Sequence, residues 1–101
     1  MKKLIMVVML VLIPIIGNAE NKNCSSMADF AKTIMQLRQE GAPINKVMNF
    51  IESTKEKKPK VYKVMKSIAI MAYDTPRYST PSLKEKTIDE FYSTIYLNCI
   101  K

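Results

Sequence analysis

The chain contains no histidine and no tryptophan, and it has only two cysteines and two glycines. Without histidine, Ser-His-Asp triads, Cys-His dyads and histidine-ligated metal sites are excluded. Two cysteines alone cannot complete a usual zinc shell. Two glycines are too few for a Gly-rich loop of the kind that holds phosphates. We therefore expect no metal, no cofactor and no histidine-based catalysis.

The first nineteen residues have the pattern of a secretory signal peptide. Lys2 and Lys3 form a short basic region, an apolar run extends from Leu4 to Ile13, and Gly17 and Ala19 supply small residues at the cleavage site. A transmembrane anchor is the alternative, but a membrane span needs about 20 apolar residues, and this run is shorter. The pattern predicts cleavage and an exported protein, and the short basic and apolar regions favour the periplasm.

Cleavage divides the chain into a signal peptide, residues 1–19, and one helical domain, residues 20–101. Both cysteines, Cys24 and Cys99, lie at the ends of that domain. In an oxidising compartment two cysteines typically form a disulfide, and an intermolecular bridge or reactive thiols are the alternatives. A lipid anchor on Cys24 is not expected, because the Asn-Lys-Asn tripeptide before it does not match a lipoprotein signal.

Apolar residues recur at helical spacing in four stretches, and no segment of five or more residues alternates with the period of a strand. Turn residues separate the stretches: Gly41 and Pro43 follow the first, Pro59 begins the third, and Thr80-Pro81 begins the fourth. We therefore predict an all-α fold, a small bundle of about four helices. The four predicted stripes are Met27, Phe30, Ala31, Ile34 and Leu37; Ile44, Val47, Met48 and Ile51; Val61, Val64, Met65, Ile68 and Ala72; and Ile88, Phe91, Tyr92, Ile95 and Cys99.

The two cysteines continue two of these stripes. Cys24 lies one turn before Met27, in line with the first stripe, and Cys99 lies on the last stripe. Both sulfurs should therefore point at the same core, which favours an intramolecular bridge between the two ends of the domain. Ser26, followed by Asp29, predicts that the first helix starts close to the first cysteine.

The excess of positive charge lies in one segment. Apart from the signal peptide, the chain has 14 Lys and Arg against 9 Asp and Glu, and residues 55–66 hold six lysines with one acid, Glu56. Clustered charge steers association with anionic partners, whereas a solvated helix junction is the alternative. Nucleic-acid binding is not expected, because arginines and an aromatic stacking platform are missing. This lysine segment comprises Lys55, Lys57, Lys58, Lys60, Lys63 and Lys66.

The segment Tyr73–Ser82 is a second candidate binding surface. Two X-Pro steps and short polar residues predict a loop. Tyr73, Arg77 and Tyr78 belong to residue types that are enriched at interface hot spots. The alternative is that the tyrosines pack over the helix ends and the prolines set the turn.

Carboxylates on the last predicted helix are the remaining candidates for acid–base chemistry. Glu85, Asp89 and Glu90 lie close together in the sequence, and two carboxylates can hydrolyse a glycoside when one of them is desolvated. Lysines interrupt this group, so we expect a solvated helix face. The sequence predicts no catalytic residue and no enzyme.

Two blocks of residues form a recognisable pattern when they are taken together. The specific pieces are Ala-Tyr-x-x-Pro-x-Tyr-Ser-Thr at residues 72–80 and Tyr-Leu-x-Cys-Ile at residues 96–100, with an earlier block at Cys24, Ala28, Ile34, Met35, Arg38, Gln39 and Gly41. This pattern resembles small exported two-cysteine helical proteins of enterobacteria and their phages. The resemblance implies export, a helical fold and an end-to-end bridge. It implies no activity and no functional residues.

These features favour an exported, non-enzymatic protein that binds or modulates an envelope protein or an anionic envelope component. An inhibitor or immunity protein linked to a phage or prophage is one form of this hypothesis. A structural or stress-linked envelope protein is the first alternative, and a small hydrolase using the last-helix carboxylates is the second. Stable membrane insertion is not expected once the signal peptide is removed.

Overall fold

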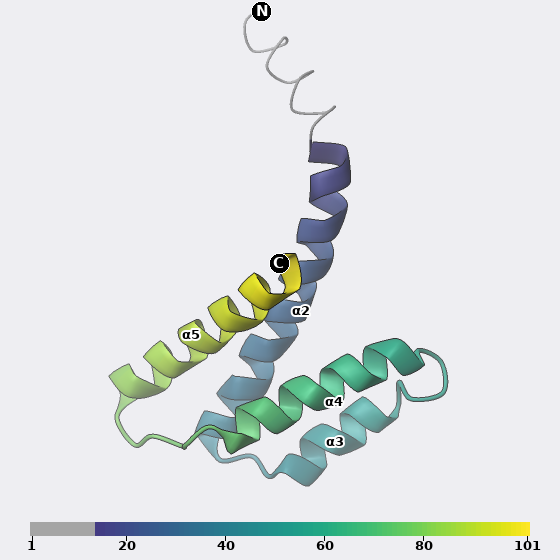
Figure 1. Cartoon of the computed structure of the whole chain (residues 1–101). Coiled ribbons are helices and arrows are strands. Elements are labelled where there is room, and N and C mark those ends of the chain that lie inside the picture. The colour runs from purple at the N-terminus through teal and green to yellow at the C-terminus, as the bar shows by residue number, and fades with distance from the viewer. Residues whose placement is uncertain (1–13) are drawn as a thin grey trace, which may run out of the picture.

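The computed structural model describes residues 14–101, with side chains from residue 23 onward, and this part of the chain consists of α-helices without a strand (Figure 1). The predicted all-α fold with four helices is confirmed. The predicted signal peptide lies outside the residues whose side chains are described, and its cleavage stays a prediction. The helices are α2 (Pro14–Glu40), α3 (Ile44–Glu52), α4 (Pro59–Asp74) and α5 (Pro81–Ile100).

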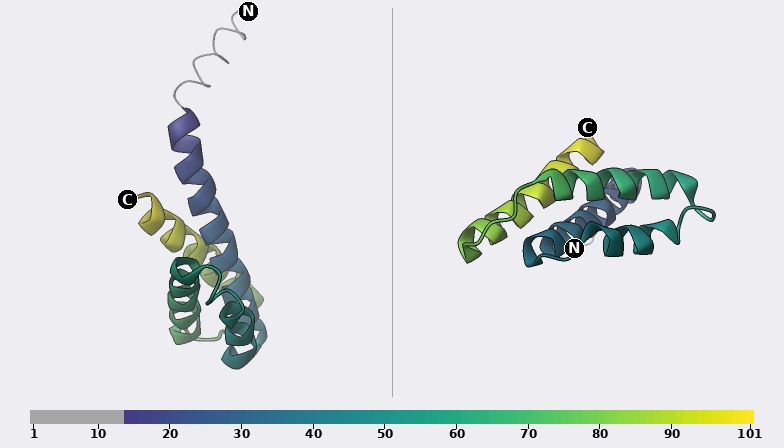
Figure 2. Two further views of the ribbon diagram at one scale, coloured as in Figure 1. Left: turned by 90° about the vertical axis from the view of Figure 1, so that its right-hand side faces the viewer. Right: turned by 90° about the horizontal axis from the view of Figure 1, so that it is seen from below.

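Helix α2 packs against both α5 and α4, and α3 packs against α4 (Figure 1). The helices α3 and α4 lie side by side and run in opposite directions, as both figures show (Figure 2). The radius of gyration is 17.0 Å, whereas a compact chain of about 100 residues has a radius near 13 Å. Part of this difference arises because the first turns of α2 extend beyond the other helices (Figure 1).

The core draws buried apolar residues from all four predicted stripes. Four of them are alanines on α2 and α4, and they are fully buried. Small side chains at these positions let the helix backbones approach closely. The buried apolar residues are Cys24, Ala28, Ala31, Ile34 and Met35 of α2, Val47 and Ile51 of α3, Ile68, Ala69 and Ala72 of α4, and Phe91 and Ile95 of α5.

The first helix begins earlier than the sequence predicts. Ser26 and Asp29 lie inside α2, which the structure describes from Pro14 onward. No glycine or proline occurs between Gly17 and Gly41, so no residue in this stretch strongly disfavours the helix. A helix that has formed adds one hydrogen bond for each further residue, and it therefore extends past a candidate cap.

A disulfide joins Cys24 of α2 to Cys99 of α5 across 75 positions of sequence, with the two Cα atoms 5.5 Å apart. The intramolecular pairing predicted from the two stripes is confirmed, and it ties α2 to the last turn of α5. Such a bridge is compatible with an oxidising, exported location. Among the helices that the structure describes, none has both the length and the apolar character needed to cross a membrane.

Helix α2 ends in a Schellman motif, as the glycine after it predicts. The Gly41 N–H donates to the Arg38 carbonyl at 3.1 Å, and the Ala42 N–H donates to the Leu37 carbonyl at 2.9 Å. Gly41 has a φ of +92°, in the left-handed region. A Cβ atom at this position would lie 2.9 Å from the Arg77 Nη2 atom. The backbone angle therefore favours glycine, and the end of the Arg77 side chain would have to move aside for a Cβ atom.

Replacing this glycine should destabilise the protein. We expect Gly41→Ala to lower the free energy of unfolding by about 1–2 kcal/mol, because alanine is strained at a positive φ and must displace Arg77. Urea titration followed by circular dichroism measures the change. The control Asn49→Ala, at an exposed position of α3, should change stability by less than about 0.5 kcal/mol. Equal effects of the two variants would contradict the requirement for glycine.

Candidate binding surfaces

The lysine segment surrounds the start of α4. All six lysines are exposed. Lys55 and Lys57 lie in the turn after α3, Lys58 immediately precedes α4, and the other three lie on α4 itself. The ammonium groups are therefore available to solvent and to a partner over the turn after α3 and the first two helical turns of α4.

Tyr62 organises one side of the lysine segment. Its hydroxyl donates a hydrogen bond to Glu52 Oε2 at 2.8 Å, which links α4 to the end of α3. The ammonium groups of Lys55 and Lys66 lie 5.7 and 6.0 Å from the centre of its ring. The hydrogen bond to Glu52, followed by desolvation and the carboxylate charge, raises the pKa of the Tyr62 phenol. Two of the six lysines are thus held against this ring.

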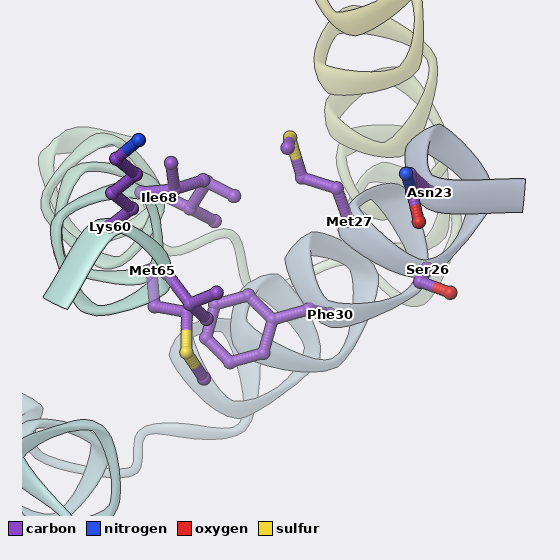
Figure 3. Close-up of a pocket in the computed structure, with 9 residues that line it drawn as sticks. Asn23, Ser26, Met27, Phe30, Lys60, Met65 and Ile68 are labelled. Atoms are coloured by element: carbon purple, nitrogen blue, oxygen red, sulfur yellow. The ribbon is translucent and has the colours of Figure 1, made fainter. Parts of the chain in front are cut away.

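An apolar hollow of about 510 Å³ lies between α2 and α4, on the other side of the lysine segment (Figure 3). In Figure 3 Met27 and Phe30 extend from α2 on the side that faces α4, and Met65 and Ile68 of α4 line the same hollow. The apolar lining residues are Met27 and Phe30 of α2 and Val61, Val64, Met65 and Ile68 of α4; the polar ones are Asn23, Ser26 and Lys60.

A second hollow of about 350 Å³ continues the first toward α5. The two hollows share Met27, Val64 and Ile68, so they adjoin each other beside α4, and together they are here called the α2–α4 groove. It follows α4 from Lys60 to Met71, which is about 16 Å of helix. The other residues lining the second hollow are Lys63, Ser67 and Met71 of α4 and Ile95, Asn98 and Cys99 of α5.

The groove exists because the apolar stripe of α4 is longer than the part that α2 covers. Ile68 and Ala72, in the second half of α4, are buried, whereas Val61 and Val64, in the first half, are 44% and 38% exposed. The sequence predicts all four as members of one buried stripe. The crossing of α2 over α4 leaves the first half of that stripe in contact with solvent.

The loop between α4 and α5, residues 75–80, is held against the end of α2. It is shorter than the predicted segment 73–82, because Tyr73 lies in the last turn of α4 and Ser82 in the first turn of α5. The Tyr73 hydroxyl donates to the Ala42 carbonyl at 2.7 Å. Arg77 donates through Nε to the Gln39 carbonyl at 3.1 Å and through Nη2 to the Glu40 carbonyl at 3.5 Å. Cationic side chains at a helix C-terminus also interact favourably with the helix dipole. These contacts give Tyr73 and Arg77 a structural role, and binding of a partner by this loop stays a prediction.

Arg38 reinforces the same junction from the α2 side. Its Nε donates to the Thr75 carbonyl at 3.0 Å, and its guanidinium carbon lies 5.4 Å from the centre of the Tyr73 ring. Partial burial raises the pKa of the Tyr73 phenol, and the Arg38 charge opposes that rise. The phenol therefore stays neutral and donates its hydrogen bond at physiological pH.

Gln39 is not among the residues predicted as functional, although it holds the loop in place. Its side chain is 1% exposed, donates to the Pro76 carbonyl at 2.9 Å and accepts from the Tyr78 N–H at 2.8 Å. Its own backbone carbonyl accepts from Lys84 Nζ at 2.6 Å as well as from Arg77. The sequence feature that could have identified Gln39 is its position one turn after Met35, which is buried.

The carboxylates of α5 lie in an open position. Glu85, Asp89 and Glu90 are exposed and line a shallow hollow of about 410 Å³ together with Ser82 and Lys86. Within the described part of the chain, no group of three or more His, Cys, Asp or Glu side chains is placed to hold a metal ion. Carboxylates with perturbed acidity need burial, so this geometry does not favour the hydrolase hypothesis.

No family model matches the chain, and neither a curated protein nor a solved structure matches it. The resemblance to enterobacterial and phage proteins stays a prediction. Function therefore has to be inferred from the surfaces of this molecule.

The structure places four of the six lysines in two pairs. Lys60 and Lys63 line the α2–α4 groove, whereas Lys55 and Lys66 lie against Tyr62. The first pair places positive charge directly beside exposed apolar side chains. An apolar surface with charge at its edge is suited to binding a partner, because burial of the apolar part supplies affinity and the charge supplies selectivity.

Proposed function

We propose that the protein is an exported, non-enzymatic binding protein that modulates an acidic protein of the bacterial envelope through its lysine segment. The observation that carries this proposal is that all six lysines are exposed and that two of them, Lys60 and Lys63, line the apolar α2–α4 groove. The clustered ammonium groups accelerate encounter with an acidic partner. The groove then offers apolar area that a partner can bury.

Export supports the same proposal. The signal pattern at the start of the sequence and the Cys24–Cys99 bridge both suit an oxidising compartment outside the cytoplasm. In that compartment an inhibitor or immunity protein acts by occupying the surface of its target, which needs a rigid scaffold and no catalytic group. A phage or prophage origin belongs to this proposal as well.

Charge reversal in the lysine segment should abolish partner binding. The test variant carries Lys57→Glu, Lys58→Glu, Lys60→Glu and Lys63→Glu. We expect tagged wild-type protein to retain a specific partner from periplasmic extract after crosslinking at low salt, and the variant to retain at least tenfold less. Binding by the wild type should also weaken above about 0.2 M salt, because exposed charges are then screened beyond about 7–8 Å.

A matched control has the same net charge as the test variant. It carries Glu at four exposed lysines outside the segment, namely Lys32, Lys46, Lys86 and Lys101. This control should bind the partner within about threefold of wild type. If both variants lose the partner equally, the segment has no special role. If the test variant binds normally, the site moves to the loop Tyr73–Ser82. Recovery of no specific partner at low salt would contradict the proposal itself.

A further inference from the structure

We propose that the α2–α4 groove is the docking site for an acidic amphipathic helix of the partner protein. This inference rests on the proposed function and names the part of the partner that is bound. Three observations support it: the apolar lining of the groove, the sign of the charge at its edge, and its length along α4.

The lining is apolar and adaptable. Val61, Val64 and Met71 are 44%, 38% and 41% exposed, although each is an apolar side chain of α4. Met27 and Met65 also line the groove, and methionine side chains repack readily around different partners. Burial of this surface by a partner would release about 25 cal/mol for each Å² of apolar area removed from water.

The edge of the groove is basic. Lys60 and Lys63 lie on consecutive turns of α4, each next to a valine of the lining. Of the residues that line the two hollows, none is acidic. A docked helix would therefore gain from glutamate or aspartate side chains beside its apolar face and would be opposed by lysine or arginine there.

The length of the groove fits three turns of helix. The distance along α4 from Lys60 to Met71 is about 16 Å, which corresponds to about eleven residues of a docked helix. Such a helix presents apolar side chains at positions i, i+4 and i+7 on one face, the usual arrangement of a helix bound in a groove.

Two other occupants fit less well. A second copy bound across a two-fold axis would bring the same patch against itself, so Lys60 and Lys63 would face like charges. A single acyl chain would remain partly in water, because the groove is open along one side, whereas ligand pockets usually enclose most of a small ligand. An acidic helix both covers the open side and neutralises the lysines.

The experiment uses two synthetic amphipathic peptides of about 14 residues, with leucine at i, i+4, i+7 and i+11 on one face. One has glutamate beside the leucines, and the other has lysine at the same positions. Fluorescence anisotropy measures their binding to the disulfide-bonded protein at about 50 mM salt, where electrostatic effects are strong. We expect the glutamate peptide to bind at least tenfold more tightly than the lysine peptide.

Substitutions in α4 locate the bound peptide. Val64→Asp, which places a charge in both hollows, should weaken binding of the glutamate peptide at least tenfold. Ile70→Asp is the matched control, because Ile70 is an aliphatic residue of the same helix that is 44% exposed and does not line the groove. It should leave binding unchanged.

The lysines at the edge of the groove provide a second test. Lys60→Glu with Lys63→Glu should weaken binding more than Lys55→Glu with Lys66→Glu. Circular dichroism checks that every variant is folded.

Several results would overturn the inference. Equal binding of the two peptides would contradict the charge argument. Equal effects of Val64→Asp and Ile70→Asp would contradict binding of the peptide in the groove. Binding to phosphatidylglycerol vesicles that depends on Val64, without binding of the glutamate peptide, would assign the groove to a membrane. Concentration-dependent dimerisation lost in Val64→Asp would assign it to a second copy. If the natural partner is still captured by Val64→Asp but not by the quadruple lysine variant, the proposed function stands and only the groove inference fails.

Discussion

Removal of the disulfide is expected to produce the largest loss of stability of any substitution considered for this protein. In the double variant Cys24→Ala, Cys99→Ala, the free energy of unfolding should fall by about 4 kcal/mol. The bridge closes a loop of 75 positions, and the loop-entropy relation gives about 4–5 kcal/mol for a loop of that length. The loss arises mainly because the unfolded chain regains freedom, and burial of Cys24 adds a small packing contribution.

The size of the domain makes this loss decisive. Proteins have a stability of about 0.05–0.15 kcal/mol per residue, so a domain of roughly 80 residues has about 4–12 kcal/mol in total. Losing about 4 kcal/mol therefore removes a third or more of the stability. Urea titration of the oxidised wild type, the reduced wild type and the double variant measures it. The last two should have similar transition midpoints, both well below that of the oxidised protein.

The matched control changes the neighbours of the cysteines and retains the bridge. Ser25→Ala with Asn98→Ala should stay within about 0.5 kcal/mol of wild type, as is usual for positions near the surface. A loss below about 1 kcal/mol in the double cysteine variant would contradict the loop-entropy argument. A disulfide-linked dimer of wild type on a non-reducing gel would contradict the intramolecular pairing itself.

Local sequence signals are sufficient to predict the helices. Gly41 ends α2, Pro59 begins α4 and Pro81 begins α5, each at the residue where the sequence places it. These signals depend on backbone angles and missing N–H groups, which act within one turn of the chain. The beginning of α2 differs, because Ser26 and Asp29 lie inside the helix and do not cap it.

The extent of burial could not be predicted from the stripes alone. Periodicity identifies which face of α4 is apolar, but the crossing point of α2 decides which part of that face is covered. Val64 and Ile68 have the same place in the pattern, yet the first is 38% exposed and the second 3%. The α2–α4 groove therefore results from the way α2 crosses α4. It cannot be predicted from the sequence pattern of a single helix.

The composition of the candidate site could be predicted from the sequence, but its arrangement in space could not. The sequence shows the excess of lysine in residues 55–66 and predicts that it is exposed. It does not show that Lys60 and Lys63 lie on the groove while Lys66 lies against Tyr62. That division depends on the packing of α3 against α4, which positions Glu52 to accept the hydrogen bond from Tyr62.

The contacts of Gln39 could not be predicted from the sequence, because its partners lie far along the chain. Its amide bonds the backbone of residues 76 and 78, which lie 37 and 39 positions further along the chain. Among the described residues, every buried side-chain nitrogen and oxygen atom has a hydrogen-bond partner, so both polar atoms of this amide are paired. A buried amide is stable only where its partners are provided, and here the loop after α4 provides them.

Truncation of this side chain should therefore cost more than loss of its volume alone. We expect Gln39→Ala to lower the free energy of unfolding by about 2–4 kcal/mol, because the Pro76 carbonyl and the Tyr78 N–H each lose their partner in a partly buried place. An unsatisfied buried polar group costs about 1–3 kcal/mol. Urea titration measures the total. Gln36→Ala, at an exposed position of the same helix, is the matched control and should change stability by less than about 0.5 kcal/mol.

Amide exchange distinguishes this mechanism from a simple cavity. If Gln39 acts by holding the loop, the Tyr78 amide should exchange with solvent at least tenfold faster in Gln39→Ala, while amides in the middle of α5 change only as much as global stability does. If Gln39 merely fills space, all protected amides should accelerate together. The Tyr78 amide is the appropriate probe because its hydrogen goes to the Gln39 Oε1 atom. Selective acceleration at Tyr78 would show that one glutamine at the end of α2 fixes the conformation of a loop that begins more than 30 residues later.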